Sequence, residues 1–178
     1  MQPCHVALIG ATGGVGREIL QVMEERELSL RDVTLIASAQ SEGTRMEVCG
    51  HKTVVRQLTK DALAGVDIAI FAAEVAQSQD YAAYAVSAGA VVIDCSGAFR
   101  LDPQVPLCIP EVNPEVLPTH PSIVATPHSL TVQTVLALAP LHTAASLRRV
   151  VVSTYQAVSG MGRSAMQEFD QQMRDLLN

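Results

Sequence analysis

Two patterns of apolar positions alternate along the first two thirds of this chain. Continuous apolar runs, which are typical of buried strands, occupy residues 5–9, 33–37, 66–72 and 90–94. Between them, apolar residues recur at helical spacing over 17–26, and an alanine-rich helical stretch covers 77–88. Parallel sheets are covered by helices on both faces, so their strands are apolar throughout. The alternation therefore predicts an α/β fold built on a mostly parallel sheet.

Two segments interrupt this alternation. Residues 45–48 and 53–57 flank Gly50 and His51, and they predict a small antiparallel hairpin. Prolines crowd the stretch 103–127, which we interpret as a long excursion between two parts of the molecule. A short strand is expected inside this excursion, at residues 122–125.

The C-terminal part predicts a helix from about 131 to 147, a strand at 149–155 and an amphipathic helix at 164–177. These elements are too few for an independent domain, and an apolar strand needs neighbours in a sheet. We therefore expect a first domain at 1–128 and the start of an incomplete second α+β domain at 129–178. The missing neighbours would come either from a longer chain or from a partner.

A glycine-rich turn directly follows the first predicted strand and opens the first helix. Its residues, in the spacing GxxGxxG, include Gly10, Thr12, Gly13, Gly14, Val15 and Gly16. Glycine permits a tight turn and lets the backbone approach a pyrophosphate, whose charge the helix N-terminus favours. The spacing is a variant of the dinucleotide fingerprint. It predicts a Rossmann-type dinucleotide-binding domain; the alternative is a plain glycine-rich strand-to-helix turn.

The end of the second predicted strand bears on the choice of cofactor. NAD-specific sites usually place an acid there to hold the ribose hydroxyls, whereas this chain has Ser38. The missing acid favours a cofactor with a 2′-phosphate, and so NADP. No arginine stands beside Ser38 in the sequence, and an ordinary loop residue is the alternative interpretation of this serine.

Composition limits the partners and the compartment. Hydrophobic residues make up 48% of the chain, the net charge is −6, and no basic run is present, so no nucleic-acid partner is expected. No apolar stretch is long enough for a membrane span, and the first residues lack the pattern of a signal peptide. We therefore expect no membrane association and a cytoplasmic protein. The four cysteines form no CxxC pair, which predicts reduced thiols and no metal site.

Four motifs together point to one family. They are the glycine turn, the run AFRLD at 98–102, the run PEVNP at 110–114 and the run STYQAVSG at 153–160. On these motifs the chain resembles the aspartate-semialdehyde dehydrogenases, NADP-dependent phosphorylating oxidoreductases of amino-acid biosynthesis. The resemblance implies a small-molecule substrate, a second domain for substrate binding and dimerisation, and a homodimer of the full-length protein. The run from Gln156 to Gly160 argues against the related N-acetyl-glutamyl-phosphate reductases.

The resemblance also implies roles for residues of the first domain. Thr12, Gly13 and Val15 would lie along the cofactor phosphates, and Ser38 would contact the 2′-phosphate. Arg100 would bind inorganic phosphate or the acyl phosphate. The sequence itself supports an anion ligand at Arg100, because binding sites of open α/β sheets gather after strands. A surface salt bridge is the alternative for this arginine.

In the second domain, the resemblance implies that Gln156 would help to orient the substrate. Ser159 and Gly160 would lie near the nicotinamide. The family's nucleophile is a cysteine that follows an asparagine just before a long helix. Here Ser129 stands at the position of that cysteine and His128 at the position of the asparagine.

The serine changes the chemistry that the family's mechanism needs. In that mechanism a thiolate adds to the aldehyde, hydride leaves to NADP, and phosphate displaces the thioester. A serine hydroxyl is far less acidic than a thiol and needs a positioned base. We do not expect His128 to be this base, because adjacent residues rarely aim their side chains at one another. A helix N-cap is the structural alternative for Ser129.

Three further positions depart from the family. Glu74 and Val75 replace a glycine pair near the cofactor, where a carboxylate would repel the pyrophosphate. Gln40 replaces an arginine, and Cys95 replaces an asparagine. Two hypotheses follow: an oxidoreductase of this family whose phosphorylating dehydrogenase activity is altered or absent, or a non-catalytic paralogue. The paralogue would act by binding a nucleotide, an anion or another protein.

Overall fold

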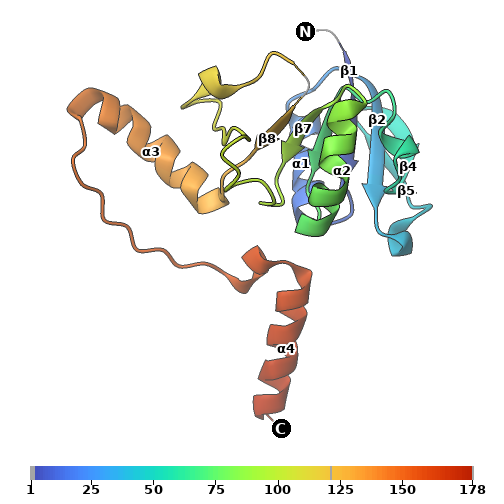
Figure 1. Ribbon diagram of the computed structural model, residues 1–178. Helices are drawn as coiled ribbons and strands as arrows, with labels where there is room; N and C mark the ends of the chain where they lie inside the picture. Colours follow the sequence, from blue (N-terminus) through green and yellow to red (C-terminus); the bar gives the residue numbers. More distant parts are fainter. Residues whose placement is uncertain (1–2, 121, 178) are drawn as a thin grey trace. The chain divides into compact units, whose positions relative to one another are not determined.

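The computed structural model describes residues 3–120 and 122–177 (Figure 1). The chain forms two compact units, Met1–Pro140 and Leu141–Asn178. The first unit contains the sheet with the helices that cover it. The second contains the end of one helix, an irregular segment and the last helix.

A six-stranded sheet forms the centre of the first unit. Its strands are β1 (Cys4–Ile9), β2 (Leu30–Ala37), β5 (Arg56–Gln57), β6 (Ile68–Phe71), β7 (Val91–Asp94) and β8 (Ile123–Ala125). Their order across the sheet is β5-β2-β1-β6-β7-β8, and every neighbouring pair is parallel. The α/β fold with a mostly parallel sheet is therefore confirmed.

Helices α1 (Gly14–Glu25) and α2 (Val75–Ser87) cover opposite faces of this sheet (Figure 1). Successive side chains of a strand point to opposite faces, and β1 divides its apolar residues accordingly. Leu8 packs in the cluster that contains Leu20 of α1, whereas Ile9 packs in the cluster that contains Ala82 of α2. The two apolar layers explain why β1 is apolar at every position from residue 6 to residue 9.

The predicted hairpin is present with a tighter turn. It consists of β3 (Arg45–Val48) and β4 (His51–Val54), which pair antiparallel. The turn is formed by Cys49 and Gly50, whose φ angles of 49° and 79° suit a two-residue hairpin loop. The chain then leaves the hairpin, because Arg56 and Gln57 pair with β2 in the main sheet rather than with β3.

The proline-rich excursion follows β7 and is tied back to the sheet at β8. Ala125 of β8 donates from its backbone N–H to the carbonyl of Pro106 at 2.9 Å, and its own carbonyl accepts from Cys108 at 3.0 Å. The residues that the structure describes also form four short 3-10 helices: Ala39–Ser41, Asp61–Leu63, Pro114–Val116 and Val158–Met161.

The strand predicted at 149–155 is wrong. Residues 146–157 have no regular secondary structure, and Val151 is 79% exposed. A strand is held by hydrogen bonds to a neighbour, and within the described residues no strand pairs with this segment. The two predicted helices on either side of it are present, as α3 (Ser129–Ala145) and α4 (Arg163–Leu177).

Candidate dinucleotide and anion sites

The strand order fixes where a ligand would bind. From β1 the chain crosses to β2 on one side, and from β6 it crosses to β7 on the other, so the direction of winding reverses between β1 and β6. In open α/β sheets, ligands bind at the carboxyl ends of the strands at such a switch point. The glycine turn follows β1 and the segment from Ala72 to Glu74 follows β6, so both border this crevice.

Two glycines of the turn are required by close backbone contacts. Gly10 has a φ of +90°, and a Cβ built on it would lie 2.3 Å from the carbonyl oxygen of Ala72. A Cβ on Gly16 would lie 2.1 Å from the carbonyl oxygen of Gly10. The turn therefore sits directly against the end of β6, and α1 packs directly against the turn. A residue with a Cβ therefore does not fit at either position unless the backbone shifts.

The first turn of α1 has the features of an anion site. Its N-cap residue, Gly13, supplies no side-chain hydrogen bond, and the first turn contains no acidic residue. A Cβ on Gly14 would meet no atom within 4 Å, and Val15 is 57% exposed. The helix therefore presents free backbone N–H groups and the positive end of its dipole to open space. A dinucleotide pyrophosphate fits this cradle.

The turn is joined to the loop that follows β2. The hydroxyl groups of Thr12 and Ser41 lie 3.1 Å apart, and the backbone N–H of Ser41 donates to the carbonyl of Ser38 at 2.9 Å. Ser38 itself is exposed at the end of β2. From α1, the Nε of Arg17 donates to the carbonyl of Thr12 at 3.2 Å. Sequence reasoning missed Arg17, because nothing in its spacing indicates that it folds back onto the turn.

Glu74 lies on the other side of the same crevice. It is the N-cap residue of α2, it is exposed, and its carboxylate makes no side-chain cap hydrogen bond. It comes two residues after Ala72, whose carbonyl oxygen faces Gly10. The contact between Gly10 and Ala72 therefore places the residue that carries this exposed carboxylate near the glycine turn.

A second cluster lies at the carboxyl ends of β7 and β8. Its centre is Asp94, which is fully buried. The carboxylate accepts hydrogen bonds from the backbone and the hydroxyl of Ser96, at 3.1 and 2.6 Å, and from the N–H groups of Gly97 and Phe99, at 3.2 and 3.4 Å. Sequence reasoning passed over Asp94 as the end of a strand. The signal in the sequence that could have identified Asp94 is a charged residue at the end of an apolar run.

The turn that Asp94 holds carries Arg100. The Nε of Arg100 donates to the carbonyl of Thr126 at 2.8 Å, and one terminal nitrogen, Nη2, donates to the carbonyl of Cys95 at 3.3 Å. A Cβ on Gly97 would lie 3.0 Å from the other terminal nitrogen, Nη1. The half-buried guanidinium thus uses two nitrogens on the protein, and Nη1 has no hydrogen-bond partner among the described residues. In the described part of the chain it forms no salt bridge with a carboxylate.

Ser129 begins α3, three residues after Thr126, and it is exposed. The N-cap position belongs to His128 instead. Its carbonyl accepts from the N–H of Val132 at 3.0 Å, and its ring Nδ1 accepts from the N–H of Leu130 at 3.3 Å. The interpretation of Ser129 as an N-cap is therefore wrong, because the helix starts one residue earlier than that interpretation requires.

Burial raises the pKa of three thiols of the first unit, those of Cys49, Cys95 and Cys108. The pKa of Cys95 is raised, mainly by burial and also by the nearby Asp94 carboxylate, although Thr126 and Arg100 act in the opposite direction. Burial likewise raises the pKa of Cys49 and of Cys108, with added repulsion from nearby glutamates. A protonated thiol is a poor nucleophile. Cys95 therefore lies beside the Arg100 cluster without thiolate character.

The remaining predicted site residues lie in the second unit. Ser159 and Gly160 belong to the 3-10 helix Val158–Met161, and both are exposed, as is Gln156. A Cβ on Gly160 would lie 3.7 Å from the side-chain oxygen Oε1 of Gln156. The structure thus brings the amide of Gln156 next to Gly160 within this unit.

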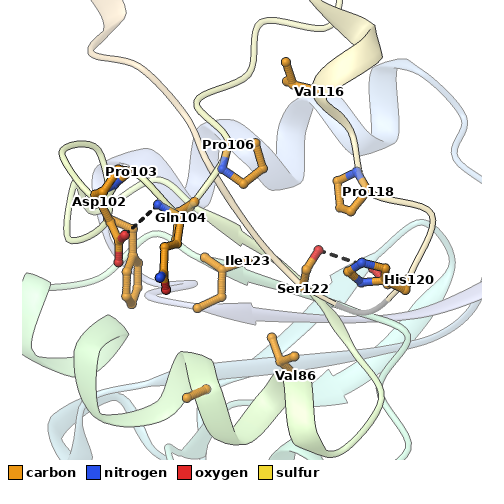
Figure 2. Close-up of a pocket in the computed structure, with 13 residues that line it drawn as sticks. Val86, Asp102, Pro103, Gln104, Pro106, Val116, Pro118, His120, Ser122 and Ile123 are labelled. Carbon is orange, nitrogen blue, oxygen red and sulfur yellow. Dashed lines mark hydrogen bonds between the residues drawn. The ribbon is translucent and has the colours of Figure 1, made fainter.

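A separate cavity of about 700 Å³ lies between α2, β8 and the proline-rich excursion (Figure 2). Figure 2 shows Pro106, Pro118 and Ile123 around it, and two polar contacts at its rim. There the N–H of Gln104 donates to the Asp102 carboxylate at 2.9 Å, and Ser122 donates to the carbonyl of His120 at 3.2 Å. None of the predicted site residues lines this cavity.

The fold and the glycine turn define a dinucleotide-binding α/β protein. The family model "Semialdehyde dehydrogenase, NAD binding domain" matches residues 5–120, and "Semialdehyde dehydrogenase, dimerisation domain" matches residues 138–178. The chain therefore belongs to the semialdehyde dehydrogenase family. No helix within the described ranges is long and apolar enough to cross a membrane.

Similar proteins carry the name aspartate-semialdehyde dehydrogenase. The protein of that name from Bacillus subtilis (strain 168) is 43% identical over 174 residues, which cover 98% of this chain and 50% of the relative. The one from Aquifex aeolicus (strain VF5) is 44% identical and is covered to 51%. The crystal structure of aspartate semialdehyde dehydrogenase II from Vibrio cholerae, complexed with ASA, matches with a TM-score of 0.88 at 39% identity. That match covers 100% of this chain and 54% of the solved one. The chain thus spans about half the length of its relatives.

Proposed function

We propose that this protein is an aspartate-semialdehyde dehydrogenase-like member of the family that keeps the dinucleotide-binding domain without the phosphorylating dehydrogenase step. The observation that carries the proposal is Ser129, an alcohol at the start of α3 where the family's nucleophile is a cysteine. An alcohol near neutral pH is almost entirely un-ionised, and its ester reacts less readily with phosphate than a thioester does.

The surroundings of Ser129 support this proposal. The Nδ1 of the adjacent His128 accepts a backbone hydrogen bond from Leu130, so this nitrogen is not available as a base for the serine hydroxyl. The nearby thiol of Cys95 has a raised pKa, so it does not replace the missing thiolate. General-base activation and thiolate chemistry, the two usual ways to make a nucleophile, both lack support here.

NADP is the proposed cofactor, bound weakly. Ser38 ends β2 in place of the acid that would favour NAD, and the α1 cradle suits the pyrophosphate. When bound, NADP would supply the hydride acceptor. The exposed Glu74 carboxylate opposes binding, because it borders the same crevice. We further propose a cytoplasmic homodimer, with residues 138–178 at the interface, and a domain boundary between residues 128 and 129.

A second candidate function is binding without catalysis. Arg100 keeps one terminal nitrogen on a turn that Asp94 already holds in place, which favours binding of an inorganic anion or a phosphorylated ligand. Calorimetric titration with inorganic phosphate tests this candidate. Binding that disappears in the Arg100→Met variant supports it, and no binding by the unaltered protein contradicts it.

The main proposal is tested by assaying phosphate-dependent reduction of NADP with aspartate semialdehyde. We expect no detectable turnover, although NADP should bind in a parallel titration. A turnover in the ordinary dehydrogenase range, ~1–1000 per second, would show that the phosphorylating step is intact. The Ser129→Cys variant is the second measurement. It should remain inactive, because Glu74 and Val75 still alter the cofactor crevice, and recovered activity would show that this crevice is sound.

A further inference from the structure

The loop after β2 contains no basic residue that could receive a 2′-phosphate. Residues 38–44 read Ser-Ala-Gln-Ser-Glu-Gly-Thr, so the loop offers hydroxyl groups and one carboxylate. That carboxylate, on Glu42, accepts a hydrogen bond from the side chain of Gln57 at 2.7 Å. A phosphate dianion bound at Ser38 would need a cation from another element, because hydroxyl groups alone do not neutralise its charge.

Helix α1 supplies a cation next to this loop. The Nε of Arg17 donates to the carbonyl of Thr12 at 3.2 Å, so the side chain folds back from the helix onto the glycine turn. The hydroxyl of the same Thr12 lies 3.1 Å from the hydroxyl of Ser41. The N–H of Ser41 in turn donates to the carbonyl of Ser38 at 2.9 Å. Three hydrogen bonds, made through different atoms of Thr12 and Ser41, thus connect Arg17 with Ser38.

The hydrogen bond from Nε of Arg17 to Thr12 leaves the two terminal nitrogens of the guanidinium available for a ligand. Among residues 3–120 and 122–177, neither Nη atom has a hydrogen-bond or ion-pair partner, and the residue is exposed. A guanidinium anchored through Nε presents its two Nη groups as a planar fork, which matches the geometry of a phosphate. The anchor also removes part of the entropy that a free arginine side chain would lose on binding.

We propose that Arg17 is the residue that selects NADP over NAD in this protein, by pairing with the 2′-phosphate beside Ser38 and Ser41. The inference rests on the proposed binding of NADP. It assigns to α1 the positive charge that members of this family were expected to place at position 40, where this chain has Gln40. The hydroxyl of Ser38 and the proton that the Thr12–Ser41 pair does not use between its own two oxygens would supply further donors to that phosphate.

The test compares ligands that differ only in the 2′-phosphate. Calorimetric titrations measure NADP against NAD, and 2′,5′-ADP against 5′-AMP, for the unaltered protein and for Arg17→Ala and Arg17→Lys. The adenosine pair avoids Glu74, because these ligands lack the pyrophosphate. Arg26→Ala is the matched control, since it removes the same charge from the other end of α1. Circular dichroism checks that every variant folds.

We expect Arg17→Ala to weaken NADP and 2′,5′-ADP by roughly tenfold or more, and NAD and 5′-AMP by less than about twofold. Arg17→Lys should keep part of the preference, and Arg26→Ala all of it. Equal weakening of both members of a pair, or an unchanged affinity for 2′,5′-ADP, would overturn the inference. If the unaltered protein binds NADP and NAD equally well, the proposed role of Arg17 is contradicted, whereas the proposed binding of a dinucleotide is supported. If the protein binds none of the four ligands, the proposed binding of NADP is contradicted, and with it the role of Arg17.

Discussion

The guanidinium of Arg100 donates from Nε to the carbonyl oxygen of Thr126 at 2.8 Å, so a residue that follows β7 is fastened to the end of β8. A second bond, to the carbonyl of Cys95 at 3.3 Å, returns to the turn from which the side chain starts. Three donor nitrogens in one plane allow this arrangement. The orientation of the cation therefore comes from backbone carbonyls of the residues that follow two neighbouring strands.

This relationship predicts that charge alone is not enough at position 100. Arg100→Lys keeps the charge, but its single nitrogen cannot hold two carbonyl groups and an anion in fixed directions. We expect the variant to lose roughly 1 kcal/mol of unfolding free energy. It should also bind inorganic phosphate about tenfold more weakly than the unaltered protein does. Urea unfolding and calorimetry measure the two effects. Phosphate binding equal to that of the unaltered protein would contradict the geometric role.

The glycine turn predicts a contrast between neighbouring glycines. Gly10→Ala and Gly16→Ala place a Cβ 2.3 and 2.1 Å from backbone oxygens, so the turn, β6 or α1 must shift. We expect each to lower the unfolding free energy by about 1–3 kcal/mol, and Gly10→Ala by more because its φ is also positive. Gly14→Ala is the control, since its Cβ would meet nothing within 4 Å. Equal effects in all three variants would mean that the close contacts do not limit the turn.

Glu74 predicts that the cofactor affinity of this protein can be raised by a single substitution. Glu74→Gln removes a negative charge beside the pyrophosphate cradle without changing the size of the side chain. We expect NADP to bind about 3- to 10-fold more tightly, which corresponds to roughly 1 kcal/mol for an exposed charge. Glu111→Gln, which removes an exposed charge elsewhere, should leave the affinity unchanged. Calorimetry at low and high salt measures both variants, and the gain should shrink as salt is added.

Cys95 predicts a pH dependence of stability. Its pKa is raised in the folded protein, so the native state prefers the protonated thiol. The contribution is fully present below the pKa of the unfolded thiol, about 8.5, and it is lost as the pH rises through the folded value. We expect the stability difference between the unaltered protein and Cys95→Ala to shrink from neutral pH to about pH 10. Urea unfolding at both pH values measures it, and a difference that grows with pH would have the wrong sign.

Much of the fold was predictable because its strands are buried on both faces. Residues 6–9 and 68–71 are apolar at every position, and they form the parts of β1 and β6 that pair with a strand on each side. The segment 149–155 contains an apolar run at 150–152, yet it forms no strand. An apolar pattern records what a segment would bury, whereas a strand also requires a hydrogen-bonding neighbour, which the described residues do not provide.

The candidate site was predictable only where backbone geometry depends on residue type. The glycine turn shows in the sequence because Gly10 and Gly16 tolerate no Cβ. Arg17 and Asp94 did not stand out, because their importance comes from bonds to backbone groups that only the folded chain brings near. Ser129 was interpreted as the N-cap of the following helix, but the N-cap is His128 and Ser129 is the first residue of α3. Histidine is not among the residue types preferred as N-caps, so the sequence favoured the serine.

Asp94 holds in place the turn that carries Arg100, and this affects the binding of an anion there. Four donors from one short turn converge on a carboxylate to which solvent has no access. The protein's own hydrogen bonds hold that turn, so an anion bound beside it would cost little further conformational freedom. A small phosphate would meet a rigid receptor rather than induce one, and its affinity would depend mainly on charge and fit.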